Sequence, residues 1–274
     1  MLGSQAEAED AVQEAWLRWH EADKSGVEHP RAFLSQTVTR LCLDRLKSAR
    51  AQREVYVGPW LPEPLVDEAG YTDAGPEMAS ELASDLSFAF MLALERLSPL
   101  ERAAFLLHDV FEMEFSAVAD AVGHSEAACR QLATRAREHI RENRPRFKAT
   151  SAQHARLAAV FFATAQSGDL AALTQMLADD AVFLSDGGGR VAAPQIPVRG
   201  AARVAKAMSG LMRKHGVAAD AKIRPAQVNG LTGFLVTDAG GVPIQTVAVE
   251  FRDNGRIGAL YVVRNPDKLR HLAS

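Results

Sequence analysis

Cysteine is scarce in this chain of 274 residues, which contains only Cys42 and Cys129. The two lie far apart in segments with helical periodicity, and neither forms a CxxC pair or lies near a group of histidines. The sequence therefore gives no sign of a structural zinc, a disulfide or a catalytic thiol, and we expect no metal and no cofactor.

Long apolar runs are also missing. No segment approaches the roughly 20 apolar residues that cross a bilayer, and the N-terminus lacks the basic and then apolar pattern of a secretory signal. We therefore expect a cytoplasmic protein without a membrane partner. Hydrophobic residues still make up 47% of the chain, which suffices for packed cores. The length exceeds the usual size of one core, so we expect two or three domains.

The net charge of -3 does not suggest a DNA-binding protein until the positions of the charges are considered. Contacts with DNA phosphates depend on local patches of positive charge and not on the net charge of the chain. Residues 7–23 and 77–101 are rich in acidic side chains, whereas residues 31–53 and 130–148 are rich in basic ones. This alternation predicts two DNA contacts and a separate partner for the acidic surface.

The first fifty residues predict two helices. Residues 5–22 place Val12, Ala15, Trp16 and Trp19 at helical spacing, with an acidic stripe on another face. Pro30 suits the first turn of a second helix, which should run to about Arg53. The side chains expected to face inward from this second helix are Phe33, Leu34, Val38, Leu41 and Leu46.

Residues 55–78 are broken by proline and glycine, which deny a continuous helix and indicate a linker. A purely solvated tether would not favour large apolar groups, yet this one contains Tyr56, Trp60 and Leu65. We therefore expect the linker to dock onto another part of the molecule.

Residues 77–143 predict a series of helices. After a helix to Leu97, the capping box Ser98–Glu101 begins another helix. We expect that helix to bury Ala103, Ala104, Leu107, Val110 and Phe111. Ser116 is expected to cap a short helix and Ser125 a longer one. A short helix, a turn at Gly123 and a longer basic helix form a helix-turn-helix pattern.

The helix after Ser125 has one apolar and one basic face. Its predicted buried stripe consists of Cys129, Leu132, Ala133, Ala136 and Ile140. The opposite surface and its flanks carry Arg130, Gln131, Thr134, Arg135, Arg137 and Arg141. Arginine can bridge guanine and glutamine can bridge adenine, so this face is equipped to read bases in the major groove. The alternative is a solvated basic helix in an ordinary bundle.

From about residue 149 the composition changes and predicts an α+β domain. Helices are expected at 154–166, 169–178 and 201–215, and strands around 182–184, 220–228, 231–237, 243–252 and 257–263. Asp253-Asn254-Gly255 is expected to form a hairpin between the last two strands. Three glycines at 187–189 could suggest a phosphate cradle, but no Lys-Ser/Thr follows, which favours a tight hairpin or a contact loop.

The N-terminal half resembles the extracytoplasmic-function (ECF) family of sigma factors, within group IV of the sigma-70 family. Ala8–Arg18 is similar to the polymerase-binding stretch of region 2, and Leu43–Arg50 to the end of region 2 that contacts the -10 element. Leu97–Arg102 and the helices after it resemble region 4, which reads the -35 element.

This resemblance implies core RNA polymerase and promoter DNA as partners, and it assigns residues to three surfaces. The implied polymerase-binding residues are Glu9, Asp10, Gln13 and Glu14. The implied contacts with the -10 element are Arg40, Lys47, Arg50 and Arg53. The implied contacts with the -35 element are Ser125, Arg130, Gln131, Thr134, Arg135 and Arg137.

Three further motifs resemble the sigma-J type, which carries a SnoaL-like extension with an NTF2-like cone. In that type the fused domain modulates the factor in place of a separate anti-sigma protein, so an intramolecular contact is implied. The implied regulatory contacts are Trp60, Leu61, Pro62, Glu63 and Pro64 in the linker, Asp186, Gly187, Gly188 and Gly189 after the first strand, and Asn265, Pro266, Asp267, Lys268 and Leu269 near the end.

The predicted fold is therefore multidomain, with two all-α modules and a C-terminal α+β cone. The expected boundaries are 1–54 for region 2, 55–78 for the linker, 79–148 for region 4 and 149–274 for the SnoaL-like domain. Members of the family usually have about one more helix ahead of the position of Met1, so region 2 is expected to be truncated or to lack that part.

Two other classes of function stay open at this point. The chain could be a repressor-type DNA binder that acts without polymerase. It could also be an enzyme or a small-ligand sensor whose N-terminal half localises it, with Asp186, Asp238 and Glu250 as acid-base candidates and His215 as a lone histidine. We expect it not to be an enzyme.

Overall fold

A computed structural model describes residues 1–22, 27, 29–53, 56–67, 88–141, 151–214 and 221–273. The chain divides into two compact units. The first unit combines Met1–Val55 with Ala89–Arg144, and the second combines Tyr56–Phe88 with Pro145–Ser274. The linker thus belongs to the same unit as the C-terminal residues.

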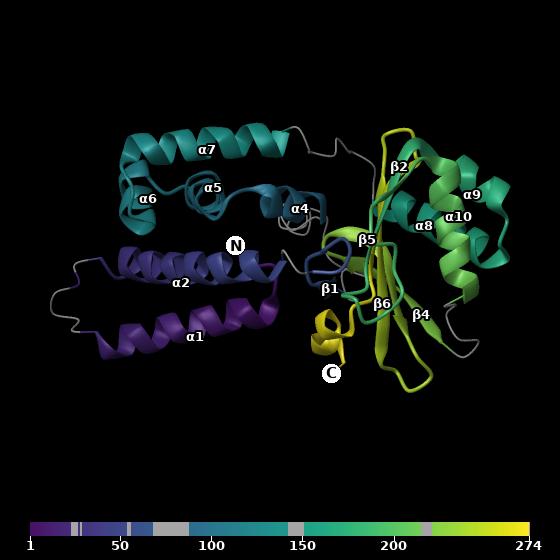
Figure 1. The fold of residues 1–274 in the computed structure, drawn as a ribbon, viewed down its shortest axis with the longest axis horizontal. Coiled ribbons are helices and arrows are strands. Elements are labelled where there is room, and N and C mark those ends of the chain that lie inside the picture. The colour runs from purple at the N-terminus through teal and green to yellow at the C-terminus, as the bar shows by residue number, and fades with distance from the viewer. Residues whose placement is uncertain are drawn as a thin grey trace. The chain divides into compact units, whose positions relative to one another are not determined.

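The first unit is helical (Figure 1). Its elements are α1 (Gln5–Glu21), α2 (Pro30–Arg53), α4 (Phe88–Arg96), α5 (Pro99–Phe105), the π-helix η3 (Leu106–Val110), α6 (Phe115–Val122) and α7 (Glu126–Arg141). Gly123 takes a left-handed φ of 77° and turns the chain between α6 and α7. The helix-turn-helix pattern is confirmed.

The core of this unit joins α2 to the helix-turn-helix. The predicted stripe on α7 is confirmed, since Cys129, Leu132, Ala133, Ala136 and Ile140 are all buried. Leu43 from α2 packs in the same cluster as residues of α5, α6 and α7. Gln36 also donates a hydrogen bond to the Asp120 carbonyl at 2.7 Å. Of the five residues expected to face inward from α2, Leu46 is buried and the other four are half-buried.

Some expectations for the first unit were wrong. Val110 and Phe111 are 36% and 60% exposed, because the π-helical turn adds a residue per turn and rotates both away from the core. Ser116 is not a cap: α6 already begins at Phe115, whose ring stacks on His108. The capping box is confirmed, since Ser98 and Glu101 bond each other's backbone amides.

The second unit is a mixed sheet covered by helices on one face (Figure 1). Its helices are α8 (Ser151–Ser167), α9 (Leu170–Met176) and α10 (Ala201–Lys214), followed at the C-terminus by the 3-10 turns η4 (Pro266–Lys268) and η5 (Arg270–Leu272). Its strands are β1 (Val66–Asp67), β2 (Leu177–Asp186), β3 (Val198–Arg199), β4 (Lys222–Val228), β5 (Leu231–Thr237), β6 (Pro243–Phe251) and β7 (Ile257–Val263). The strand order is β1-β4-β5-β6-β7-β2-β3, with β2 parallel to β7.

The face of the sheet under the helices is filled by the main core. Phe161, Phe183 and Phe251 are each no more than 2% exposed and lie in this cluster. The predicted hairpin at 253–255 is confirmed, with Gly255 at a φ of 74°. None of the helices in the described ranges is long and apolar enough to span a membrane.

Candidate functional site

Helix α7 presents the side chains predicted to read DNA. Its start is fixed by Ser125, whose Oγ accepts a hydrogen bond from the Ala128 amide at 3.2 Å. The residues of the predicted -35 surface are all exposed: Ser125, Arg130, Gln131, Thr134, Arg135 and Arg137. Only the side chain of Arg141 lies outside the described residues. One face of α7 therefore carries both hydrogen-bonding and cationic groups.

Three of these arginines have carboxylate partners within the same unit. Arg130 lies 3.0 Å from Glu126 and over the Phe115 ring. Arg137 lies 2.6 Å from Asp109. The side chains of both arginines stay about half exposed, and exposed ion pairs contribute only about 0–1 kcal/mol. A phosphate or a base edge can therefore compete for these two arginines.

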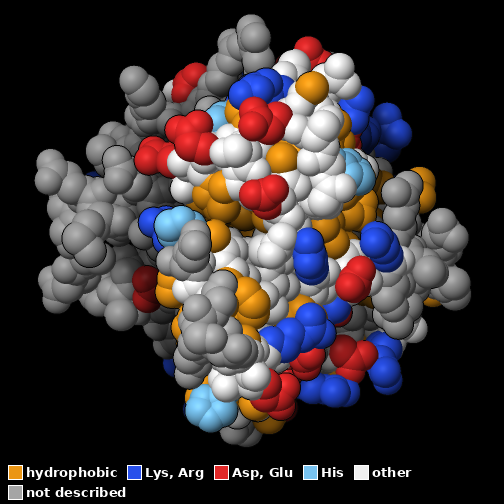
Figure 2. Space-filling model, turned by 90° about the vertical axis from the view of Figure 1, so that its left-hand side faces the viewer, with side chains coloured by type: hydrophobic (Ala, Val, Ile, Leu, Met, Phe, Trp, Pro, Cys, Tyr) orange, Lys and Arg blue, Asp and Glu red, His pale blue; other side chains and the backbone are white. Residues whose placement is uncertain are grey.

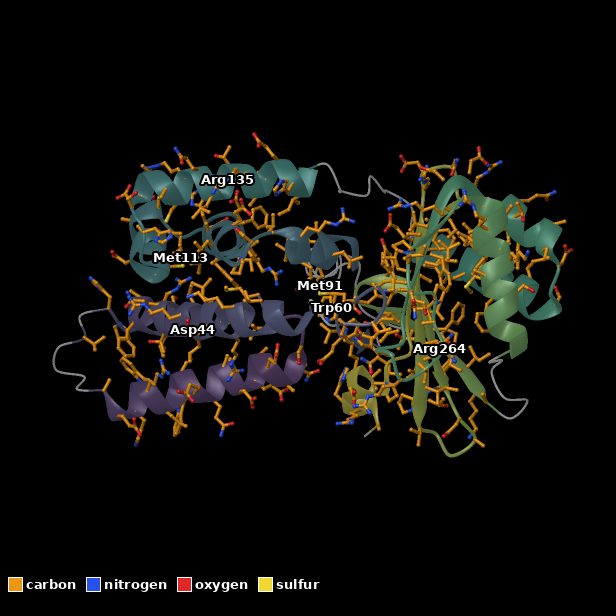
Figure 3. All side chains as sticks on the ribbon, viewed as in Figure 1. Asp44, Trp60, Met91, Met113, Arg135 and Arg264 are labelled. Carbon is orange, nitrogen blue, oxygen red and sulfur yellow. The ribbon has the colours of Figure 1, made fainter. Side chains whose placement is uncertain are left out.

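Arg135, which projects from α7 (Figure 3), differs from the other two. Its Nε donates to Glu101 at 2.9 Å, and the Glu101 side chain is largely buried in the capping box. Burial alone would favour the neutral acid, but hydrogen bonds from Ser98 and Arg135 hold the pKa of Glu101 below its usual range. Arg135 therefore contributes to holding α5 against α7.

The predicted -10 surface is only partly described. Arg40 and Lys47 are exposed on α2, and Lys47 lies 3.5 Å from Asp44. The side chains of Arg50 and Arg53, and most of the loop at residues 23–29, lie outside the described residues. Figure 2 shows a face on which Lys and Arg side chains lie scattered among acidic and hydrophobic ones.

Helix α1 exposes apolar groups beside the predicted polymerase-binding residues. Glu9, Asp10 and Gln13 are exposed, and Glu14 pairs with Arg18 at 3.0 Å. Val12, Ala15 and Trp16 lie at helical spacing, but they do not share a buried face. The structure buries Ala11 and Ala15 and leaves Val12, Trp16 and Leu17 at 62%, 58% and 44% exposure. Because alanines allow α2 to approach closely, the larger side chains turn outward.

In the second unit, Asp186 organises the predicted regulatory motifs around one carboxylate. Its side chain is fully buried at the end of β2. Oδ1 accepts hydrogen bonds from the Tyr56 hydroxyl at 2.5 Å and the Gly188 amide at 3.0 Å. Oδ2 accepts from the Leu61 amide at 2.8 Å and from Lys268 Nζ at 2.7 Å. One side chain thus joins the linker to both C-terminal motifs.

Lys268 also binds the linker directly. Its Nζ donates to the Leu61 carbonyl at 2.5 Å and lies 4.1 Å from the centre of the Trp60 ring. The Tyr56 ring lies 5.1 Å from the same ammonium. Burial and the Asp186 carboxylate raise the pKa of Tyr56, so this hydroxyl stays a hydrogen-bond donor. Desolvated cation–π contacts of this kind contribute about 2 kcal/mol.

A second group of contacts holds the end of the linker. Asn229 is 1% exposed, and its Oδ1 accepts from the Leu65 amide while its Nδ2 donates to the Glu63 carbonyl. His271 Nε2 lies 2.8 Å from the Pro64 carbonyl. Strand β1 then pairs antiparallel with β4 and extends the sheet. We call these two groups of contacts, which hold residues 56–67, the linker clamp.

Sequence reasoning missed Tyr56 as a hydrogen-bond donor, Asn229 and His271. The Asn229-Gly230 pair signals a turn between strands, and both residues do have positive φ. Nothing local indicates that the Asn229 side chain reaches a segment more than 160 residues away.

The glycines after Asp186 are required by close packing. A Cβ on Gly187 would lie 2.3 Å from the Val191 carbonyl oxygen, and one on Gly188 would lie 2.3 Å from Asn265 Nδ2. Gly188 and Gly189 also have φ of 59° and 70°, which glycine adopts at little cost. The prediction of a contact loop is confirmed.

The acid-base candidates do not form a common catalytic group. Asp238 accepts the Val242 amide within a turn. Glu250 accepts the Tyr261 hydroxyl at 2.7 Å, and burial raises its pKa. Asp186 is occupied by the linker clamp, and His215 lies outside the described residues. The described residues contain no group of three or more side chains able to hold a metal ion.

Comparisons with known proteins bear on both units. Residues 1–52 match Sigma-70 region 2, and residues 87–140 match Sigma-70, region 4. The ECF RNA polymerase sigma factor SigJ of Mycobacterium tuberculosis is 38% identical, over 98% of this chain and 87% of that protein. The chain belongs to the ECF sigma factor family.

Other similarities agree with this assignment. The crystal structure of M. tuberculosis SigJ matches with a TM-score of 0.74 at 36% identity, covering 98% of this chain and 91% of that one. A probable ECF sigma factor of the same species, SigI, is 34% identical over 65% of this chain and 60% of that protein. The predicted family, its sigma-J type and the multidomain fold class are therefore confirmed.

Proposed function

We propose that this ECF sigma factor directs promoter-specific initiation through three separate surfaces. Helix α1 binds core RNA polymerase, α2 contacts the -10 element and α7 reads the -35 element. The exposed cationic and amide groups of α7 support this assignment for the -35 element. The exposed apolar and acidic groups of α1 fit a large protein partner.

We further propose that the C-terminal domain restrains the factor through the linker clamp. In the first unit, region 2 and region 4 share a core and the bond between Gln36 and Asp120. The -10 and -35 elements lie about 25 base pairs apart, or about 85 Å at 3.4 Å per pair. The two regions must therefore separate before both can bind one promoter.

The linker clamp limits how far they can separate. The 34 residues at 54–87 could span at most about 120 Å if fully extended. While residues 56–67 are held on the C-terminal domain, only the 22 residues at 54–55 and 68–87 can extend, to about 75 Å together, and the held segment adds a fixed distance. Releasing the clamp lengthens the tether, so the clamp acts as a brake on promoter binding.

Run-off transcription with purified core polymerase tests this proposal. We expect the full-length protein to give a promoter-dependent product and Trp60→Ala to increase it, because the Lys268 ammonium loses its ring contact. A footprint on DNA without polymerase, and no product with it, would support a repressor instead. An unchanged or lower yield with Trp60→Ala would exclude the brake.

Arg130→Ala is expected to weaken specific binding to the -35 element by about 1–3 kcal/mol if the guanidinium bridges a base. Fluorescence anisotropy with matched and scrambled duplexes measures this. Arg18→Ala is the control, because Arg18 forms an equivalent exposed pair at 3.0 Å with Glu14 on α1. Equal losses on both duplexes would show that Arg130 contacts phosphate.

A further inference from the structure

The π-helical turn η3 contacts two arginines of α7, one directly and one through an aromatic ring. We propose that η3 positions Arg130 and Arg137 for DNA and thereby contributes to specificity for the -35 element. This role rests on the proposed reading of that element by α7. The positioning residues are His108, Asp109 and Phe115.

The backbone of η3 departs from an α-helix although no residue forces it to. The Phe111 amide donates to the Leu106 carbonyl, five residues back, at 3.0 Å. Glu112 then takes a φ of 53°, which residues other than glycine rarely adopt. Residues 106–113 contain neither proline nor glycine. Because single π turns are rare and occur frequently at functional sites, the side chains of η3 are candidates for a function.

His108 of η3 orients Arg130 through the ring of Phe115. The His108 Nδ1 donates to the Met113 carbonyl at 2.8 Å, since a carbonyl oxygen can only accept. The imidazole held in this way stacks on Phe115, with 3.8 Å between the ring centres. The Arg130 guanidinium carbon lies 4.8 Å from the centre of the same Phe115 ring. Two of the five guanidinium N–H groups donate to Glu126, which leaves three as donors for DNA.

Asp109, the next residue of η3, holds Arg137 directly. Its Oδ1 accepts from Arg137 Nε at 2.6 Å, and the two side chains are 23% and 44% exposed. This bond does not use the Nη groups, which can donate to a guanine or to a phosphate. Arg130 and Arg137 are seven residues apart, so their Cα atoms lie about 10 Å apart along the helix axis. That distance equals about three base-pair steps of DNA.

Orienting an arginine before it binds favours discrimination between bases. A free arginine side chain has many rotamers and can turn to a phosphate or to a neighbouring base when the preferred base is missing. An arginine held by a ring or a carboxylate has lost part of this freedom before DNA arrives, so binding the preferred base costs less entropy. Loss of the positioning contacts should therefore lower specificity more than total affinity.

The specificity ratio, which is the affinity for a preferred -35 element divided by the affinity for a scrambled one, separates positioning from a plain charge effect. Asp109→Asn removes a negative charge. If Asp109 acted through charge alone, the variant would bind every sequence more tightly by the same factor, and the specificity ratio would not change. A positioning role predicts a lower specificity ratio.

The test uses the full-length protein bound to core polymerase. This holoenzyme selects its preferred -35 element from promoter duplexes randomised at that element, and fluorescence anisotropy then gives the specificity ratio. We expect Phe115→Leu and Asp109→Asn each to lower the ratio about fivefold, and Phe115→Tyr to stay close to wild type. The controls Phe111→Leu and Glu114→Gln should leave it unchanged, because the Phe111 side chain is 60% exposed and Glu114 makes no capping bond.

An Arg130→Ala background shows whether Phe115 acts through the arginine. In that background Phe115→Leu should change the specificity ratio by less than about twofold. Circular dichroism melts check each fold, and Asp109→Asn, at a partly exposed position, tests the turn even where Phe115→Leu does not fold. The positioning role is refuted if both variants keep the wild-type ratio, or if Phe115→Leu lowers it equally with and without Arg130. A ratio near one for the wild-type holoenzyme would instead refute the reading of the -35 element by α7, and the positioning role with it.

Discussion

Asp186→Asn is expected to lower the free energy of unfolding of the C-terminal unit by about 3–5 kcal/mol, because it leaves a buried charge without its partner. Lys268 is 7% exposed, and its ammonium lies 2.7 Å from the Asp186 carboxylate. The amide that replaces the carboxylate has one acceptor oxygen, where Asp186 now accepts four side-chain and backbone donors. Urea unfolding of the full-length protein, monitored by hydrogen exchange, measures this loss in the free energy of unfolding.

The double variant Asp186→Asn with Lys268→Met distinguishes a charge effect from lost packing. Removing both charges should recover most of the stability, since an apolar side chain can pack against Trp60 in place of the ammonium. Asp238→Asn is the control, because that carboxylate caps an exposed turn and should cost less than about 1 kcal/mol. If Asp186→Asn also costs less than about 1 kcal/mol, the linker clamp contributes little to the stability of the unit.

The same variant connects stability to regulation. The Tyr56 hydroxyl and the Leu61 amide bond different oxygens of the Asp186 carboxylate, so Asp186→Asn, which keeps one acceptor oxygen, removes the acceptor of at least one of them. The amide protons of residues 56–67 should therefore exchange faster than those of the sheet. If the proposed brake is correct, transcription should rise with this release, in the same direction as for Trp60→Ala.

Local features of the fold could be read from the sequence. The capping box at Ser98–Glu101, the buried stripe of α7 and the glycine turn of the last hairpin each depend on residues within a few positions of one another. Such patterns fix geometry through nearby backbone bonds and helical periodicity. In the second unit the helices α8 to α10 and the strands β4 to β7 were predicted, whereas the two-residue strands β1 and β3 were not.

Features that depend on contacts between residues far apart in the sequence could not be predicted from local patterns. The three motifs around Asp186 were singled out by resemblance, but no local pattern indicates that one carboxylate joins them or that Asn229 holds the linker. The π-helical turn at Leu106–Val110 also left no local signal, and it reversed the expected burial of Phe111. In both cases tertiary contacts override the periodic pattern.

Helix α1, which is proposed to bind polymerase, also has a burial pattern that its periodicity does not predict. Large apolar residues at helical spacing normally face a core, yet small alanines are buried here and Trp16 is 58% exposed. Trp16 stacks on His20 at 5.3 Å between ring centres. Tryptophan is enriched among the residues that contribute most to binding at protein interfaces.

Trp16→Ala is therefore expected to weaken binding to core RNA polymerase by about 2 kcal/mol, or about 30-fold. The fold should change little, because the side chain already lies largely in solvent. Biolayer interferometry with immobilised core polymerase measures the affinity, and the circular dichroism melt of each variant checks the fold.

Asp10→Asn separates the apolar contribution from the electrostatic one. Asp10 is also exposed on α1, but a charge at the rim of an interface acts mainly on the association rate and its dependence on salt. We expect Asp10→Asn to lower the affinity for core polymerase less than Trp16→Ala does. The loss of affinity in Asp10→Asn should fade between 0.1 and about 0.3 M salt as screening increases, whereas the loss in Trp16→Ala should persist. If Trp16→Ala binds like wild type while Asp10→Asn does not, α1 docks through its acidic stripe and the exposed apolar groups have another role.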